Sequence, residues 1–87
     1  MITTSFFIEF FYNEKPVLTE VKPCCKENNV FYYDIVIKNQ YQFTITPTSE
    51  DKGITWKVLF KNADKQVDLE LIDIIGNEIE NHLLQLN

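Results

Sequence analysis

Hydrophobic and polar residues follow one spacing along the first two thirds of the chain and another after residue 62. In the first part they alternate with a period of two, and Phe, Tyr, Ile, Val and Thr are frequent, which is typical of β-strands. In the second part apolar residues recur every three or four positions, as they do on one face of an α-helix. The pattern therefore predicts a set of strands followed by one helix.

Five strand-like segments precede the change in spacing, and short polar segments separate them. None of these connections has the dozen or more residues that a parallel crossover needs, so neighbouring strands are expected to be antiparallel. The predicted fold class is α+β: a five-stranded, mostly antiparallel meander with one C-terminal helix packed on one face. The predicted strands cover residues 5–12, 16–25, 30–38, 41–47 and 54–61.

The predicted helix covers residues 69–86. Asp68 is its expected N-cap, and Glu70 lies in the first turn, where the helix dipole favours an acid. Gly76 lies mid-helix, where glycine costs roughly 1 kcal/mol relative to Ala. Two explanations remain open: the glycine is merely tolerated, or it lets the helix approach a ring such as Trp56 closely. The expected apolar stripe contains Leu71, Ile72, Ile75, Ile79, Leu83 and Leu86.

The strand register follows from the requirement that apolar side chains share one face of the sheet. Three-residue loops at 27–29 and 38–40 place Ile35 opposite both Val21 and Phe43. The other expected pairs are Tyr12–Val17, Ile8–Val21, Lys22–Asp34, Ile37–Tyr41, Tyr33–Ile45, Phe43–Trp56 and Tyr41–Val58. The predicted core face contains Phe6, Ile8, Phe10, Val17, Val21, Phe31, Tyr33, Ile35, Ile37, Phe43, Ile45, Trp56, Val58 and Phe60.

The second face of the sheet has no helix to cover it, and even the core face is covered only if the sheet curls around the helix. This second face is mostly polar, but the first strand is apolar on both sides except at Glu9, as strands buried on both faces are. Three explanations are open: the curled chain or the 48–53 loop wraps the first strand, the molecule self-associates there, or the patch binds a ligand or partner. The expected interaction residues are Phe7, Phe11, Leu18, Tyr32 and Val36.

The length and the aromatic content sharpen this expectation. The 87 residues are the size of a single domain, 1–87. They include seven Phe, four Tyr and one Trp, a large number of rings for so small an interior. The predicted core face takes most of these rings but leaves Phe7, Phe11 and Tyr32 without evident cover.

The charge balance argues against several partners. Thirteen acids oppose eight bases, all of them Lys, for a net charge of −5. Proteins that bind nucleic acid or anionic membranes use basic patches, and base readout favours Arg, so no nucleic acid and no membrane are expected as partners. The chain has neither a secretory signal nor a run approaching the roughly 18 apolar residues of a membrane span, so a cytoplasmic location is expected.

Few residues are candidates for chemistry. The expected register sets Glu9 opposite Glu20, and paired carboxylates can share a proton or a cation, although solvation or a bulge that separates them is the simpler interpretation. Cys24 and Cys25 are adjacent and are expected to be buried or half-buried free thiols, with a vicinal disulfide switch as the alternative. His82 lies near the helix end, where the dipole favours a cation. No catalytic residue, metal ligand set or cofactor site is predicted.

These observations favour a small non-catalytic protein-interaction module rather than an enzyme. A homodimer formed through the first strand and the second sheet face is the expected partner arrangement, with an unidentified protein partner also possible. The alternatives are a binder of small hydrophobic ligands and an acidic inhibitor or immunity-type protein that masks a basic partner. The net charge of −5 is the only support for the last of these.

Overall fold

The computed structural model describes residues 4–27, 30–62 and 67–84, and for residue 27 the backbone only. These residues form one antiparallel five-stranded sheet with strand order β1-β2-β3-β4-β5, followed by one helix. The α+β meander predicted from the sequence is therefore confirmed. The elements are β1 (Phe6–Tyr12), β2 (Lys15–Glu27), β3 (Val30–Ile37), β4 (Gln40–Glu50), β5 (Gly53–Lys61) and α1 (Leu69–Leu84).

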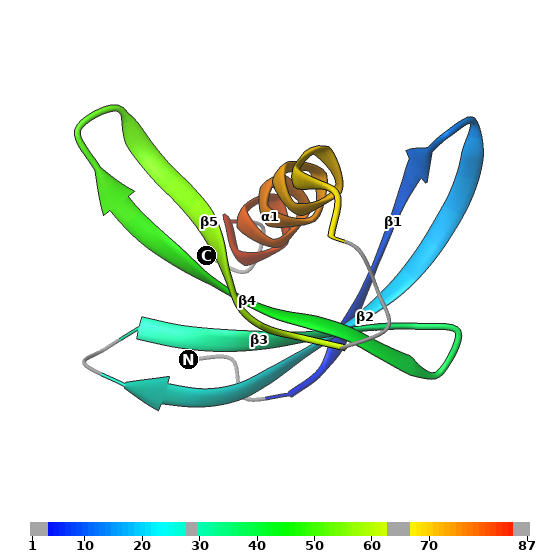
Figure 1. Ribbon diagram of the computed structural model, residues 1–87, viewed down its shortest axis with the longest axis horizontal. Helices are drawn as coiled ribbons and strands as arrows, with labels where there is room; N and C mark the ends of the chain where they lie inside the picture. The colour runs from blue at the N-terminus through cyan, green and yellow to red at the C-terminus, as the bar shows by residue number, and fades with distance from the viewer. Residues whose placement is uncertain (1–3, 28–29, 63–66, 85–87) are drawn as a thin grey trace.

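The sheet curls into a half-barrel, and α1 lies in its concave side between the β1–β2 hairpin and the β4–β5 hairpin (Figure 1). The helix contacts β1 and β5, the two edge strands. This curl is what allows a single 16-residue helix to cover one face of five strands. The outer, convex face of the sheet has no second layer among the described residues.

The first and third turns are shorter than predicted. Asn13 and Glu14 have φ values of 53° and 66°, and Lys38 and Asn39 have 53° and 63°. Two successive left-handed residues form a type I′ turn, whose twist matches that of the flanking strands. The four-residue connection implied by the expected Tyr12–Val17 pair and the three-residue loop expected at 38–40 are therefore wrong, because a two-residue turn closes each of these hairpins. Residues 28 and 29 of the loop expected at 27–29 lie outside the described residues.

The short first turn changes the register of β1 by two residues. Tyr12 pairs with Lys15 rather than with Val17, and Ile8 pairs with Thr19 rather than with Val21. A shift of two keeps every side chain on its predicted face, because side chains alternate with a period of two. The predicted faces of β1 therefore stand, whereas the predicted partners do not.

Three β-bulges shift the registers of the other strand pairs along their length. One lies between Pro23 and Cys25 in β2, one between Ile35 and Val36 in the β3–β4 ladder, and one between Thr44 and Ile45 in the β4–β5 ladder. The expected pairs Val21–Ile35, Lys22–Asp34, Ile35–Phe43 and Tyr33–Ile45 are present. The expected pairs Ile37–Tyr41, Phe43–Trp56 and Tyr41–Val58 are wrong: Ile37 pairs with Gln40, Trp56 with Pro47, Val58 with Ile45, and Tyr41 with Val36.

The bulge in the β4–β5 ladder also overturns one core assignment. Val58 pairs with Ile45 and Phe60 pairs with Thr44, so Leu59 is the extra residue. An extra residue reverses the alternation of the strand beyond it. Phe60, which was predicted to be buried, therefore points outward and is 65% exposed.

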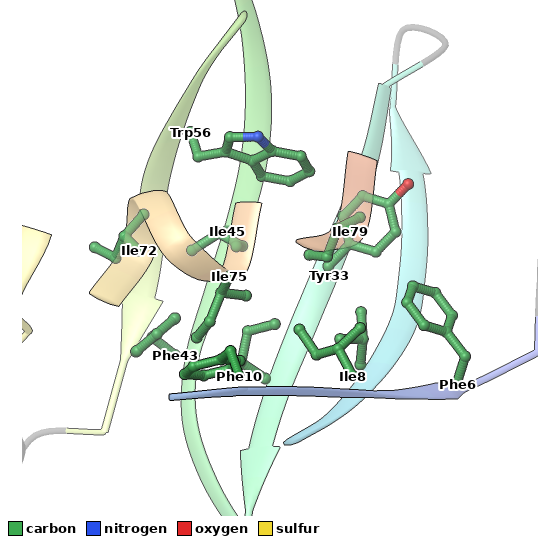
Figure 2. Packing of buried hydrophobic residues seen from close by; sticks show 12 residues of the cluster. Phe6, Ile8, Phe10, Tyr33, Phe43, Ile45, Trp56, Ile72, Ile75 and Ile79 are labelled. Atoms are coloured by element: carbon green, nitrogen blue, oxygen red, sulfur yellow. The ribbon is translucent and has the colours of Figure 1, made fainter. Parts of the chain in front are cut away.

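The core fills the space between the concave face and α1, and Figure 2 shows its side chains pointing toward one another from the sheet and the helix. The predicted core face is otherwise largely confirmed, with Val17, Phe31, Val58 and Ile37 half-buried. Leu71 and Leu83 are also half-buried, and Leu86 lies outside the described residues. The buried apolar cluster consists of Phe6, Ile8, Phe10, Val21, Tyr33, Ile35, Phe43, Ile45, Trp56, Ile72, Ile75 and Ile79.

Gly76 lets the helix approach Trp56. A Cβ atom at position 76 would lie 2.3 Å from Cδ1 of the indole and 2.5 Å from its Cγ, distances that real Cβ atoms essentially never show. The indole Nε1–H donates a hydrogen bond of 2.9 Å to Oε2 of Glu80, one turn further along α1. The close-approach explanation of this glycine is therefore confirmed.

Asp68 caps the helix and connects it to the tip of the β1–β2 hairpin. The backbone N–H of Glu70 donates to Oδ1 of Asp68 at 2.9 Å, as expected of an N-cap. The hydroxyl of Tyr12 donates to the other carboxylate oxygen. This hydrogen bond, together with the one from Glu70, lowers the pKa of Asp68, and it raises the pKa of Tyr12. The helix start is thus anchored to β1, 56 residues earlier in the chain.

Candidate functional site: the outer side of the first strand

The outer patch is defined here as the five predicted interaction residues Phe7, Phe11, Leu18, Tyr32 and Val36. Phe7 is 60% exposed, Phe11 73% and Leu18 57%, whereas Tyr32 and Val36 are half-buried. The curl of the sheet turns the concave side inward and leaves these rings outside. Wrapping of the first strand by its own chain is therefore not found among the described residues.

The structure brings together only part of this patch. Phe7 and Val36 both pair with Glu20, from the two sides of β2, so the three side chains form a row across the convex face. Tyr32 lies two positions before Asp34 in β3, and Val36 lies two positions after it, so the polar Asp34 separates Tyr32 from Val36. The compact part of the outer patch is therefore Phe7, Leu18 and Val36.

An open groove of about 390 Å³ lies beside this compact part. The groove forms beside the β3–β4 turn, because β2 begins before β3 has a residue to pair with it. Thr19, opposite Ile37, is the first residue of β2 that pairs with β3. The groove is lined by Phe7, Pro16, Val17, Leu18, Glu20, Val36, Ile37, Lys38 and Asn39. Phe7 also lines a second, more polar depression of about 480 Å³ beside the last turns of α1, so its ring separates two hollows.

Among the described residues no strand pairs with the outer edge of β1, and this edge adds backbone groups to these side chains. The two-residue turn makes Tyr12 and Lys15 a hydrogen-bonded pair, and bonded and non-bonded pairs alternate along an antiparallel ladder. The N–H and C=O groups of Phe7, Glu9 and Phe11 therefore point away from β2. Pro16, opposite Phe11, has no N–H to donate, which agrees with a non-bonded pair at that position.

The part of the convex face where β3 pairs with β4 is polar and internally bonded. The hydroxyl of Thr44 donates to Oδ1 of Asp34 at 2.7 Å and lies 2.6 Å from the hydroxyl oxygen of Tyr41. Thr44 is buried, although it lies on the convex face. The bulge in the β3–β4 ladder turns Tyr41 outward to cover it, and nothing in the local sequence indicates that bulge.

The predicted opposition of Glu9 and Glu20 is wrong. Glu9 pairs with Leu18, and Glu20 pairs with Phe7, so the two carboxylates are diagonal neighbours rather than direct partners. Glu20 lies instead 4.0 Å from the ammonium of Lys22. Within the described ranges, no group of three or more His, Cys, Asp or Glu residues is placed to hold a metal ion.

The other candidate residues lie away from the outer patch or have packing roles. The ring of His82 stacks on Phe6, with 4.0 Å between centroids and an interplanar angle of 3°. Cys24 and Cys25 are exposed, which corrects the expectation of buried or half-buried thiols, and their sulfur atoms are 2.9 Å apart. The cause is the bulge between Pro23 and Cys25.

Comparison with protein-family models found no match, and comparisons with curated proteins and with solved structures found no significant similarity. In the part of the chain that the structure describes, no helix has the length and apolar character needed to cross a bilayer. The function is therefore argued from the geometry of the outer patch.

Proposed function

We propose that this protein is a non-catalytic interaction module that forms a homodimer through β1. One observation carries the proposal: Phe7 and Phe11 are exposed on the same strand edge that presents unpaired backbone groups. Exposed rings mark interaction sites when they gather in a patch, and free strand edges pair with other strands. A second copy of β1 satisfies both features at once.

A two-fold axis at Glu9 gives the longest pairing of β1 with its copy. In this antiparallel arrangement Phe7 faces Phe11 of the second copy, and Glu9 faces Glu9 of the second copy. Because the residues with outward backbone groups pair with one another, about six backbone hydrogen bonds form. The two Phe7–Phe11 ring pairs then lie across the new strand boundary, where aromatic pairs stabilise a sheet.

The β5 edge is a poorer partner, although it also carries exposed apolar residues. Lys57 and Lys61 flank the bulge at Leu59, and Lys57 lies 3.6 Å from Glu50. Lysine and bulges on an edge strand oppose pairing with another chain. The β1 edge carries only the charge of Glu9.

The size of the patch predicts a weak dimer. An aromatic side chain offers about 150–250 Å² of surface, so two rings at 60% and 73% exposure contribute about 200–330 Å² per copy. When Leu18 and the paired backbones are added, the area buried on both copies together approaches the roughly 1,000 Å² of the smallest specific interfaces. We expect a Kd on the order of micromolar, and Glu9 limits the affinity because the two carboxylates repel one another.

Sedimentation equilibrium across a dilution series tests this proposal. The wild-type chain is expected to pass from dimer to monomer near micromolar concentration, and the double variant Phe7→Ser, Phe11→Ser is expected to weaken association by at least about tenfold. Phe60→Ser is the matched control, because Phe60 is equally exposed but lies on β5. A wild-type monomer at all accessible concentrations contradicts the proposal, as does a larger effect of the Phe60 variant.

The position of the axis has its own test. Glu9→Gln is expected to tighten the homodimer, because it removes the repulsion between the two carboxylates. Glu9→Lys is expected to form a homodimer about as weak as that of the wild type, because two ammonium groups also repel one another, and to form a tighter mixed dimer with wild type. Only an arrangement that juxtaposes the two copies of residue 9 favours the mixed dimer. Equal stability of homodimers and mixed dimers places the axis elsewhere.

The groove supports a second candidate function, the binding of a small apolar ligand. Its volume of about 390 Å³ falls within the range of ligand sites, and Phe7, Leu18 and Val36 supply apolar walls. Titration with a fluorescent apolar probe tests this function. Saturable binding to the monomer that Leu18→Ser abolishes supports it, and its absence rejects it.

A further inference from the structure

The bulge in β2 places two neighbouring thiols on the same side of the strand. In a regular strand, successive side chains point to opposite faces. Pro23 pairs with Tyr33 and Cys25 pairs with Tyr32, so Cys24 is the extra residue. As a result the sulfur atoms of Cys24 and Cys25 lie 2.9 Å apart, and both residues are exposed.

We propose that Cys24 and Cys25 form a redox site, at which a low-molecular-weight disulfide of the glutathione class oxidises the pair to a vicinal disulfide. A disulfide bond has a length of about 2.05 Å, so the sulfur atoms need to approach by about 0.9 Å. Their exposure gives a small disulfide access to both. The site is separate from the dimer proposed above and does not depend on it.

The hydrogen bond between the two sulfur atoms assigns different roles to the thiols. The Sγ–H of Cys24 donates to Sγ of Cys25. This hydrogen bond, with lesser contributions from desolvation and from Asp34, raises the pKa of Cys24 to about 11. Cys24 is therefore the protonated partner at neutral pH, and Cys25, whose sulfur accepts the hydrogen bond, is the attacking group.

The reaction proceeds by two thiol–disulfide exchanges. Cys25, after losing its proton, attacks one sulfur of the small disulfide; a Cys25 mixed disulfide forms and the first small thiolate leaves. Cys24 then loses its proton and attacks the Cys25 sulfur, which forms the Cys24–Cys25 bond and releases the second small thiolate. The two cysteines are oxidised by two electrons, the small disulfide is reduced to two thiols, and the two protons pass through solvent to the leaving thiolates.

Intact-mass analysis of the full chain treated with oxidised glutathione tests the proposal. The wild-type chain is expected to lose two hydrogens and to retain no adduct. Cys24→Ser is expected to stop at one glutathione adduct on Cys25, because the resolving thiol is absent. Cys25→Ser is expected to stop at one glutathione adduct on Cys24, because no second thiol is present to displace it.

A matched control separates the effect of the bulge from that of mere adjacency. In a Cys24→Ser, Cys25→Ser background, Thr48→Cys with Ser49→Cys places two adjacent cysteines in a part of β4 with unbroken register. These thiols are expected to acquire separate adducts rather than to close. The proposal is overturned if the wild-type chain accumulates two adducts or a disulfide between chains, or if the control pair closes as fast as the native one.

Discussion

The two sides of β1 carry the same kinds of residue and have opposite environments. Phe6 and Phe10 point into the half-barrel and are 9% and 8% exposed, whereas Phe7 and Phe11 point outward and are 60% and 73% exposed. Their chemistry and their local sequence are nearly identical, and the strand alternates regularly through all four. The difference comes from α1, which packs against the concave side only (Figure 1). Burial in this strand is thus set by the partner layer and not by residue type.

The largest effect is expected when one ring on each side of β1 is truncated. Phe10→Ala is expected to lower the free energy of unfolding by about 3–5 kcal/mol, because it removes a buried ring and leaves a cavity beneath the helix. Phe11→Ala is expected to change it by less than about 0.5 kcal/mol. Urea unfolding at sub-micromolar concentration measures both in the monomer. Similar losses from the two variants contradict the assigned faces.

A smaller effect is expected where the helix meets the sheet. Gly76→Ala places a Cβ atom within 2.3 Å of the Trp56 indole, so the helix or the ring has to move. Overpacking of this kind costs about 1–3 kcal/mol, and it opposes the gain of roughly 1 kcal/mol in helix propensity.

The neighbouring Asn77→Ala is the control for that variant, because Asn77 is exposed on the same helix and gains propensity without a clash. Urea unfolding is expected to show destabilisation for position 76 and a neutral or stabilising effect for position 77. A stabilised Gly76→Ala variant indicates that the helix does not approach Trp56 as closely as the structure shows.

The smallest effect is expected at the contact between the hairpin tip and the helix start. The pKa of Asp68 is lowered on folding, so its contribution to stability is present above the unfolded carboxyl pKa of about 4 and is lost as the pH falls through the folded value. The pKa of Tyr12 is raised, so its contribution is present below about pH 10 and is lost as the pH rises through the folded value.

Tyr12→Phe is therefore expected to lower Tm by at most a few degrees at neutral pH and to flatten the alkaline part of the Tm profile. Asp68→Asn is expected to flatten the acidic part. Thermal unfolding followed by circular dichroism between pH 3 and pH 11, about one unit beyond each group's ordinary value, measures both. Unchanged profiles show that the tip of the hairpin is not tied to the helix in solution.

The sequence was informative wherever a period of two or of 3.6 residues determines the side of an element. The faces of β1, the stripe of Ile72, Ile75 and Ile79, and the cap at Asp68 all follow from spacing and local chemistry. Even the role of Gly76 beside Trp56 was among the explanations that the pattern offered. The outward position of Phe7, Phe11 and Leu18 likewise follows from the alternation of the strands.

The exact pairing of strands was less predictable, because it depends on turns and bulges. A two-residue type I′ turn, in place of the four-residue connection implied by the expected Tyr12–Val17 pair, shifted the register of β1 by two residues and separated Glu9 from Glu20. The bulge at Leu59 turned Phe60 outward, and the bulge at Cys24 brought two thiols together. Each bulge bends its strand and increases the local twist, so its position depends on the shape of the whole sheet and is not encoded by a short stretch of sequence.

Spacing and local chemistry were enough to predict the elements of this protein, their order, and which side chains share a face, including the face that the helix covers. The extent to which the sheet curls around α1 (Figure 1), and the positions at which β-bulges shift the strand registers, depend on the tertiary structure. The physical reason is that alternation and capping are local properties, since they act within a few residues of each other. Curl, bulges and burial instead depend on contacts between residues far apart in the sequence. Because α1 packs on the concave side only, Phe7 and Phe11 stay exposed.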